Sequence, residues 1–383
     1  MYQRPILNRE AETLLKELLS RIKKIPLPQE DFQKGAKAHW DQIAKPLDGL
    51  GKLEDMLSRI CGIQGTLVPK IQEKGILVFC GDNGIVEEGV SQTGQEVTLA
   101  VVKSIAGGTS PVALLAKGAG AKVIPIDMGI KTKEPSLYSQ GVWNKRLMPG
   151  TKNFLKMPAM SMETVLQGIL TGMDAVKTCQ EEGYEILATG EMGIGNTTTS
   201  TALCCSLLDL DPREAAGSGA GLDSRGLERK REVIAAALHR YGLLGRNFRK
   251  ALKDGAERPL ALLYALGCVG GLDLAGLTGA FLGGALWQIP MVLDGIISQT
   301  AGFMASLFSP RSLFYMLPSH QGREPLAGVL HEAMGLSPIL QGDFSLGEGT
   351  GACMLFPLLD MALAVYQNNT SFDQIHIREY ERL

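Results

Sequence analysis

The sequence has few of the features that mark metal-binding, nucleic-acid-binding or exported proteins. Its seven cysteines form no CxxC pair and show no zinc-like spacing to histidine, so we expect buried thiols in a reducing cytoplasm. No run of basic residues stands out and the formal net charge is −2, which disfavours nucleic acid as a partner. Residues 1–25 form a mixed-charge amphipathic pattern without the apolar core of a signal peptide. We therefore expect a cytoplasmic protein that binds a small molecule.

One long uncharged stretch tests this expectation. Residues 274–293 carry no charged side chain and are about long enough to cross a bilayer. A pair of glycines at 283–284, followed by Gln288 and Pro290, instead suggests a helix that ends before a short strand. A helix buried against a sheet has the same composition as a membrane span. We expect the buried helix and no membrane partner, with the span as the less favoured alternative.

Apolar runs of strand length alternate with helical stretches along the chain. Four such runs occur, at 75–80, 122–126, 184–188 and 289–293. Enough residues separate them for crossover helices, which predicts a parallel sheet with flanking helices and hence an α/β fold. Helical stretches lie toward both ends of the chain, at 9–25, 52–64, 325–335 and 351–366. Because few strand signals occur there, the termini are predicted to pair into a small helical domain.

A glycine and a carboxylate follow or end each predicted strand. The pairs are Gly81 and Asp82, Asp127 and Gly129, Gly190 and Glu191, and Asp294 and Gly295. In a doubly wound sheet these positions share the carboxyl edge, where ligands bind. The alternative is that aspartate and glycine are common turn residues.

The segment 184–203 has the outline of a phosphate site. An apolar run is followed by a loop with Gly190, Gly193 and Gly195, and then by Asn-Thr-Thr-Thr at the start of a helix. Such a loop lets the backbone approach a ligand, and the helix N-terminus favours an anion. The loop has no P-loop lysine and its glycine order is not that of a dinucleotide fold. An ordinary strand-to-helix turn is the alternative.

Two further glycine-rich loops carry candidate functional side chains. The loop at 217–223 precedes a helix in which Lys230 could face a phosphate, although a solvated basic helix face is the alternative. The loop beginning at Gly342 places Glu348 before a strongly apolar helix. The helix N-terminus favours the charged carboxylate and the apolar wall favours the neutral form, a balance suited to a general base. A capping carboxylate without chemistry is the alternative.

Together these motifs closely resemble those of the nicotinate-nucleotide–dimethylbenzimidazole phosphoribosyltransferase family, over nearly the whole chain. The matching segments are KPLDGLGKLE (45–54), GDNGIVEEGVSQTGQEVT (81–98), GEMGIGNTT (190–198), SGAGLD (218–223) with Lys230, LDG (293–295), PSH (318–320) and LGEGTGA (346–352). The resemblance implies a Rossmann-like α/β domain at 67–324, a small helical domain built from 1–66 and 325–383, and a homodimer.

The resemblance also implies a reaction. Nicotinate mononucleotide and a lower-ligand base, which can be a benzimidazole, a purine or a phenol, give an α-ribazole phosphate and nicotinate. Glu348 is implied as the catalytic base. The implied nucleotide-binding residues are Glu191, Gly193, Gly195, Asn196, Thr197, Lys230 and Ser319. The implied base-binding residues are Asp82, Thr93, Val101, Met192 and Leu346. We expect no metal and no cofactor, because the monophosphate is not itself transferred.

The sequence departs from the family pattern near the base. Asn83 stands where many members have histidine, and Thr93 and Val101 replace a serine and a glutamine of some members, so the preferred base is left open. Two other functions also stay open at this stage. One is a noncatalytic subunit of a heterodimeric relative. The other is a dinucleotide-binding protein, for which Asp209, Asp211 or Glu214 would hold a ribose.

Overall fold

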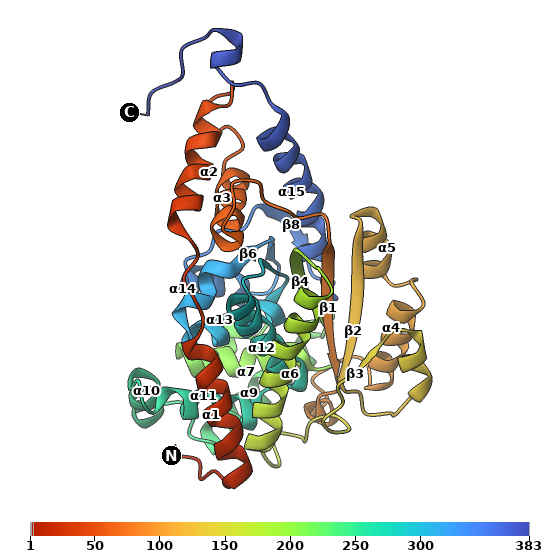
Figure 1. Ribbon diagram of the computed structural model, residues 1–383. Coiled ribbons are helices and arrows are strands. Elements are labelled where there is room, and N and C mark those ends of the chain that lie inside the picture. Colours follow the sequence, from red (N-terminus) through yellow and green to blue (C-terminus); the bar gives the residue numbers. More distant parts are fainter. Residues whose placement is uncertain (1, 3, 383) are drawn as a thin grey trace.

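The computed structural model describes residues 2 and 4–382, and its centre is a six-stranded sheet with helices on both faces (Figure 1). The strands are β1 (Lys74–Gly81), β2 (Ala121–Gly129), β3 (Trp143–Asn144), β4 (Ile186–Met192), β5 (Met291–Leu293) and β6 (Met316–Pro318). They lie in the order β3-β2-β1-β4-β5-β6 and every neighbouring pair is parallel. This is the strand order of a doubly wound sheet, and it confirms the predicted α/β fold.

The four predicted strands are present with shifted bounds. The runs at 75–80 and 122–126 lie within β1 and β2. β4 begins at Ile186 and ends at Met192, so Gly190 and Glu191 lie within the strand and do not follow it. β5 is shorter than predicted, and β3 and β6 were not predicted, because two or three residues carry no readable alternation.

Alternate residues of the central strands face two separate hydrophobic cores. Leu77 and Phe79 of β1 pack in one core, with the helices α6 (Met162–Glu181), α7 (Asn196–Leu208), α9 (Ser224–Arg240), α11 (Arg258–Val269), α12 (Leu272–Trp287) and α13 (Ile296–Phe308). Ile76 and Val78 pack in the other, with α2 (Glu30–Gln42), α3 (Lys52–Gln64), α4 (Glu96–Ala106), α5 (Pro111–Gly118) and α15 (Thr350–Asn368). Because both faces are covered, all eight residues of β1 are buried.

The uncharged stretch at 274–293 forms most of α12 and then β5, which confirms the predicted helix that ends before a short strand. Residues 272–285 are all buried, and α12 packs closely along α6. A Cβ atom at Gly172 or Gly279 would overlap a carbonyl group of the facing helix, so the glycines allow this close approach. Two other stretches, Glu96–Gly118 and Thr350–Asn368, are long and apolar enough to span a bilayer by length and composition. The first comprises α4 and α5, and the second is α15, which packs on α3, α5 and β4.

The helices at the two ends of the chain occupy different places. Figure 1 shows α2 and α3 beside α15 at the top of the molecule, and α3 packs against both. In contrast, α1 (Arg9–Lys23) packs on α6, and α14 (Leu326–Met334) packs on α13. A second, two-stranded parallel sheet joins β7 (His320–Gly322) to β8 (Leu340–Phe344). The remaining helices are α8 (Pro212–Ala215) and α10 (Arg246–Lys253). The division into two domains stays a prediction.

Candidate active site

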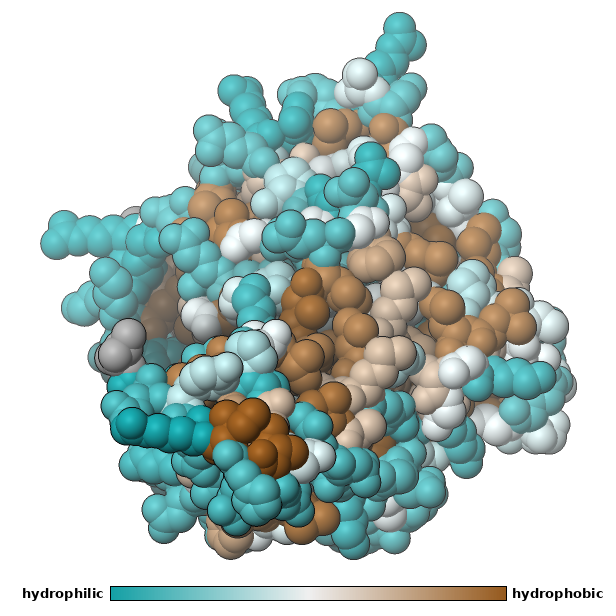
Figure 2. Space-filling view, turned by 90° about the horizontal axis from the view of Figure 1, so that it is seen from above, coloured by the Kyte–Doolittle hydropathy of each residue, from teal (hydrophilic) through white to brown (hydrophobic). Residues whose placement is uncertain are grey.

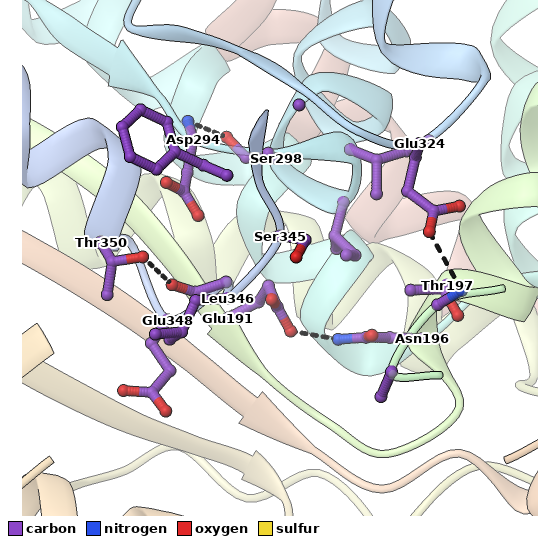
Figure 3. A pocket seen from close by; sticks show the side chains of 18 of the residues that line it. Glu191, Asn196, Thr197, Asp294, Ser298, Glu324, Ser345, Leu346, Glu348 and Thr350 are labelled. Carbon is purple, nitrogen blue, oxygen red and sulfur yellow. Dashed lines mark hydrogen bonds between the residues drawn. The ribbon is translucent and has the colours of Figure 1, made fainter. Parts of the chain in front are cut away.

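A cavity of about 250 Å³ opens beyond the carboxyl ends of β4, β5 and β6. Its wall includes residues 191–194 at the end of β4, 294–298 after β5, and 344–348 before α15. His320, Arg323 and Glu324 complete one side, and the residues around the opening are drawn in Figure 3. Ligands of doubly wound folds bind at this edge of the sheet. Of the four carboxylates predicted there, Glu191 and Asp294 line the cavity, and Asp82 and Asp127 do not contribute to the wall formed by the described residues.

The glycine-rich loop after β4 brings the N-terminus of α7 to the cavity. Gly195 has φ +91°, a left-handed conformation that glycine adopts without strain, and α7 begins at the next residue. Asn196 and Thr197, in the first turn of the helix, both line the cavity. The N–H groups of Asn196 and Thr198 donate to the carbonyls of Gly193 and Gly195, so the anion preference of this terminus comes from the Thr197 N–H and the positive end of the helix dipole.

Lys230 supplies a buried positive charge behind this helix terminus. Its side chain is fully buried on α9, and its Nζ donates to Thr197 Oγ1 at 3.1 Å and to the Gly217 carbonyl at 3.0 Å. Burial lowers the pKa of Lys230 to about 8, and the nearby Glu324 opposes this shift. Glu324 accepts the N–H of Gly219 at 3.0 Å. The lysine is thus not part of a solvated helix face, and it supports the α7 terminus from behind.

Glu348 is held in a constrained loop directly before α15. Gly347, Glu348 and Gly349 have φ values of +84°, +62° and +90°, and the left-handed region is unfavourable for a glutamate. Asp294 fixes the start of the helix, because its carboxylate accepts the N–H of Gly349 at 3.2 Å and of Ala352 at 2.9 Å. The strain at Glu348 is therefore supported by specific contacts, which is typical of a functional position.

Glu348 lines the cavity and is only 8% exposed. Its Oε2 accepts the N–H of Val112, in the first turn of α5, at 3.4 Å. Burial raises the pKa of Glu348 and the negative charge of Asp294 raises it further, whereas the hydrogen bond from Val112 lowers it. A carboxylate with a raised pKa accepts a proton more readily than one in water, which suits a general base.

Glu191 is a second buried carboxyl group in the cavity wall. Figure 3 shows it between Glu348 and Asn196, whose Nδ2 donates to Glu191 Oε2. Burial raises the pKa of Glu191 to about 8, with further contributions from Asp273, Asp294 and Glu348. At neutral pH this carboxyl group is therefore mostly protonated.

The structure brings most of the predicted site residues to one place. Glu191, Gly193, Asn196, Thr197, Val101, Met192, Leu346 and Glu348 all line the cavity. Gly195 and Lys230 do not line the cavity: Gly195 lies directly before α7, and Lys230 donates a hydrogen bond to Thr197 of the wall. Ser319 lies behind the wall, since its hydroxyl donates to the Leu293 carbonyl at 2.5 Å and lies 2.8 Å from His320 Nδ1.

Two predicted base-binding residues lie elsewhere in the described structure. Asp82 is buried after β1 and accepts the N–H of Lys131 at 2.7 Å, and Thr93 lies in an exposed loop. Neither contributes to the cavity wall formed by the described residues. The roles of all these residues stay predictions.

Sequence reasoning missed several residues of the wall. These are Ser298, Arg323, Glu324, Phe344 and Thr350. His320 had a signal in the PSH motif, and Asp294 had one in its place after a strand. Within residues 2 and 4–382, no three His, Cys, Asp or Glu side chains gather in a way that could hold a metal ion.

Comparison with known proteins places this chain in a family. Residues 25–377 match the family described as "Phosphoribosyltransferase". The chain is 36% identical over 367 residues to the nicotinate-nucleotide–dimethylbenzimidazole phosphoribosyltransferase of Ruminiclostridium cellulolyticum, covering 96% of this chain and 99% of that protein. The protein of the same name from Pseudomonas putida KT2440 is 36% identical over 344 residues, covering 90% and 93%.

A solved structure agrees with the sequence comparison. The crystal structure of CobT from Thermus thermophilus superposes with a TM-score of 0.82 at 33% identity, covering 91% of this chain and 99% of that one. The fold, the cavity and these matches define the chain as a phosphoribosyltransferase, an enzyme of the pentosyltransferase class. More particularly, the chain belongs to the nicotinate-nucleotide–dimethylbenzimidazole phosphoribosyltransferase family.

Proposed function

We propose that this enzyme transfers the ribose phosphate of nicotinate mononucleotide to a nitrogen of a lower-ligand base such as dimethylbenzimidazole. The products are an α-ribazole phosphate and nicotinate, for the nucleotide loop of cobalamin and related cobamides. The relatives' names support the substrates. The observation that carries the proposal is the buried Glu348 carboxylate, held in a left-handed loop against the cavity.

The proposed step needs one base and no acid. Glu348 takes the N–H proton of the azole while the other ring nitrogen attacks C1′ of the ribose, forming the new C–N bond. The bond from C1′ to the pyridinium nitrogen breaks, and its electron pair returns to that nitrogen. Because the leaving ring thereby loses its positive charge, it needs no proton. Attack from the face opposite the leaving group inverts C1′ and gives the α product.

The cavity offers separate places for the two substrates. We place the phosphate at the N-terminus of α7, where Thr197 and the Lys230 charge behind it favour an anion. We place the base against the apolar side chains of Val101, Met192 and Leu346, within reach of Glu348. The phosphate is a binding handle and is not transferred, so the proposed reaction requires neither a metal nor a cofactor.

We further propose a homodimer that works in the cytoplasm without nucleic acid or membrane. Exposed apolar side chains support the dimer: Leu114 on α5 and Met361 on α15 are 59% and 65% exposed, and these two helices contact each other. Figure 2 shows hydrophobic side chains gathered between hydrophilic ones on the face of the molecule seen from above. Light scattering of the purified chain tests the oligomeric state.

The function is tested by incubating the purified chain with nicotinate mononucleotide and a panel of bases. The panel contains dimethylbenzimidazole, benzimidazole, adenine and a phenol, and the products are read by mass and anomeric configuration. We expect an α-configured ribotide from at least one benzimidazole. Tight nucleotide binding without any product would instead indicate a noncatalytic subunit that needs a partner chain.

A further inference from the structure

Glu191 and a second buried carboxylate share one amide group. Asn196, in the first turn of α7, donates from its Nδ2 to Glu191 Oε2 and also to Asp273 Oδ2, the latter at 3.1 Å. All three side chains are buried: Glu191, Asn196 and Asp273 are 8%, 6% and 0% exposed. The two hydrogens of a single amide nitrogen thus join two carboxyl groups from β4 and α12.

Asp273 is enclosed behind the cavity and acts on it through Asn196. Its Oδ1 accepts the N–H of Leu274 at 2.9 Å in the first turn of α12. A Cβ atom at Gly193 would lie 3.2 Å from Asp273 Oδ2, so the glycine of the phosphate loop leaves just enough room for the carboxylate. Asp273 does not line the described cavity wall, whereas Glu191 and Asn196 do.

Three further carboxyl groups act on this pair, and Arg323 and His320 also lie in the cavity wall. Asp294 after β5 and Glu348 before α15 act on Glu191, and Asp82 after β1 acts on Asp273. Closely spaced buried carboxylates do not all ionise at neutral pH, because each negative charge disfavours the next. Burial together with Asp273 raises the pKa of Glu191 to about 8, and burial raises that of Asp273 to about 6. The upward shift is larger at Glu191, so Glu191 is the member of the pair that holds a proton at neutral pH.

A protonated Glu191 changes what the cavity can bind. Asn196 occupies Oε2, so the proton is left for Oε1, which lies on the side of Gly347 in the cavity wall. A neutral carboxyl group there donates a hydrogen bond, and it does not repel the negative charges of a nucleotide. We propose that Asp273 is a positioning residue: its negative charge keeps Glu191 protonated, and it holds the shared Asn196 amide on Oε2, so that Oε1 of Glu191 donates a hydrogen bond to the bound nucleotide.

This inference rests on the proposed function for the identity of the nucleotide, but its first test needs no substrate. Infrared spectra across about pH 6 to pH 10 follow the C=O band of the protonated carboxyl group, assigned by its loss in Glu191→Gln. We expect a midpoint near 8 in the wild type. Asp273→Asn should lower this midpoint by at least about one pH unit, because it removes a neighbouring negative charge. The control Asp31→Asn, on the exposed surface of α2, should leave it unchanged.

A second variant shifts the midpoint in the other direction. The hydrogen bond from Asn196 lowers the pKa of Glu191, so Asn196→Ser should raise the midpoint. The infrared midpoint of Asn196→Ser still tests the proposal if Asp273→Asn folds poorly. An unchanged midpoint in Asp273→Asn, or a Glu191 that is ionised throughout the range, would overturn the proposal.

Calorimetric binding of nicotinate mononucleotide supplies the functional readout. The affinity of Asp273→Asn should begin to weaken at a lower pH than that of the wild type, by the same interval as the infrared midpoint. The pKa of Lys230 is also about 8, but Lys230 is present in both the wild type and Asp273→Asn. The difference between their pH profiles of affinity therefore reports the effect of Asp273. A merely structural role would weaken binding equally at every pH. A chain that shows the shifted midpoint but transfers no ribose phosphate would refute the proposed function and leave the proton arrangement supported.

Discussion

The substitution Gly190→Ala tests whether β4 holds the Glu348 loop in place. A Cβ atom at Gly190 would lie 2.6 Å from the carbonyl carbon of Glu348 and 2.8 Å from the N of Gly349. Real Cβ atoms essentially never come within 3.0 Å of a heavy atom outside their own residue and its chain neighbours, so the loop must move. The Glu348 carbonyl oxygen would be closer still, so restoring ordinary contact requires a displacement of about 1 Å.

The displacement acts directly on the proposed base. A misplacement of about 1 Å can reduce a rate about a hundredfold, so we expect Gly190→Ala to lower kcat about tenfold to a hundredfold. This corresponds to about 1.4–2.7 kcal/mol of transition-state stabilisation. The crowded packing should also lower the free energy of unfolding by about 1–3 kcal/mol. Steady-state kinetics with nicotinate mononucleotide and dimethylbenzimidazole, together with urea denaturation, measure both effects.

A matched glycine separates this effect from a general loss of backbone freedom. Gly118 ends α5 and has no atom within 4 Å of where its Cβ would lie. Gly118→Ala should therefore retain wild-type kcat. The reasoning is refuted if Gly190→Ala turns over as fast as the wild type while a crystal structure shows the alanine in place.

Three further predictions concern the groups around the cavity. Lys230→Met should raise the dissociation constant of nicotinate mononucleotide about tenfold to a hundredfold, the effect expected when a hydrogen bond that involves a charged group is lost. The control Lys250→Met, at an exposed residue of α10, should leave the dissociation constant unchanged, and calorimetry measures both. Asp294→Asn should lower the free energy of unfolding by about 1–3 kcal/mol, because one of the two N–H groups at the start of α15 loses its acceptor, as urea denaturation would show. The base must be ionised to accept a proton, so kcat should fall as pH drops through the raised pKa of Glu348. In Asp294→Asn this acid limb should move to lower pH, because a neighbouring negative charge is gone.

Strong local patterns predicted the central sheet, but its short edges could not be predicted. β1 and β2 are long apolar runs, and glycine with a carboxylate marked their ends. β3 and β6 have two and three residues, so tertiary pairing and not their own sequence makes them strands. Burial against α6 explains why the uncharged part of α12, from residue 274 on, resembled a membrane span.

The candidate site was predictable where residues adjacent in sequence form it. The loops around Glu191 and Glu348 were readable because glycine spacing and a following helix are local signals. Asp273 was not, because its contact with Asn196 joins residues 77 positions apart. The family resemblance implied that Ser319 binds the nucleotide and that Thr93 binds the base. Their positions in the structure depend on how β6 and the loop after η1 (Gly84–Glu88) pack, which the sequence does not show.

The most direct test of the account is single-turnover transfer by Glu348→Gln. Glutamine keeps the shape of the side chain and an oxygen for the Val112 N–H, so folding and nucleotide affinity should stay near those of the wild type. It cannot take a proton, and the rate of α-ribazole phosphate formation should fall about 10²-fold to 10⁴-fold. The exposed variant Glu332→Gln on α14 should react normally. A Glu348→Gln rate close to that of the wild type would contradict the role of Glu348 as the general base.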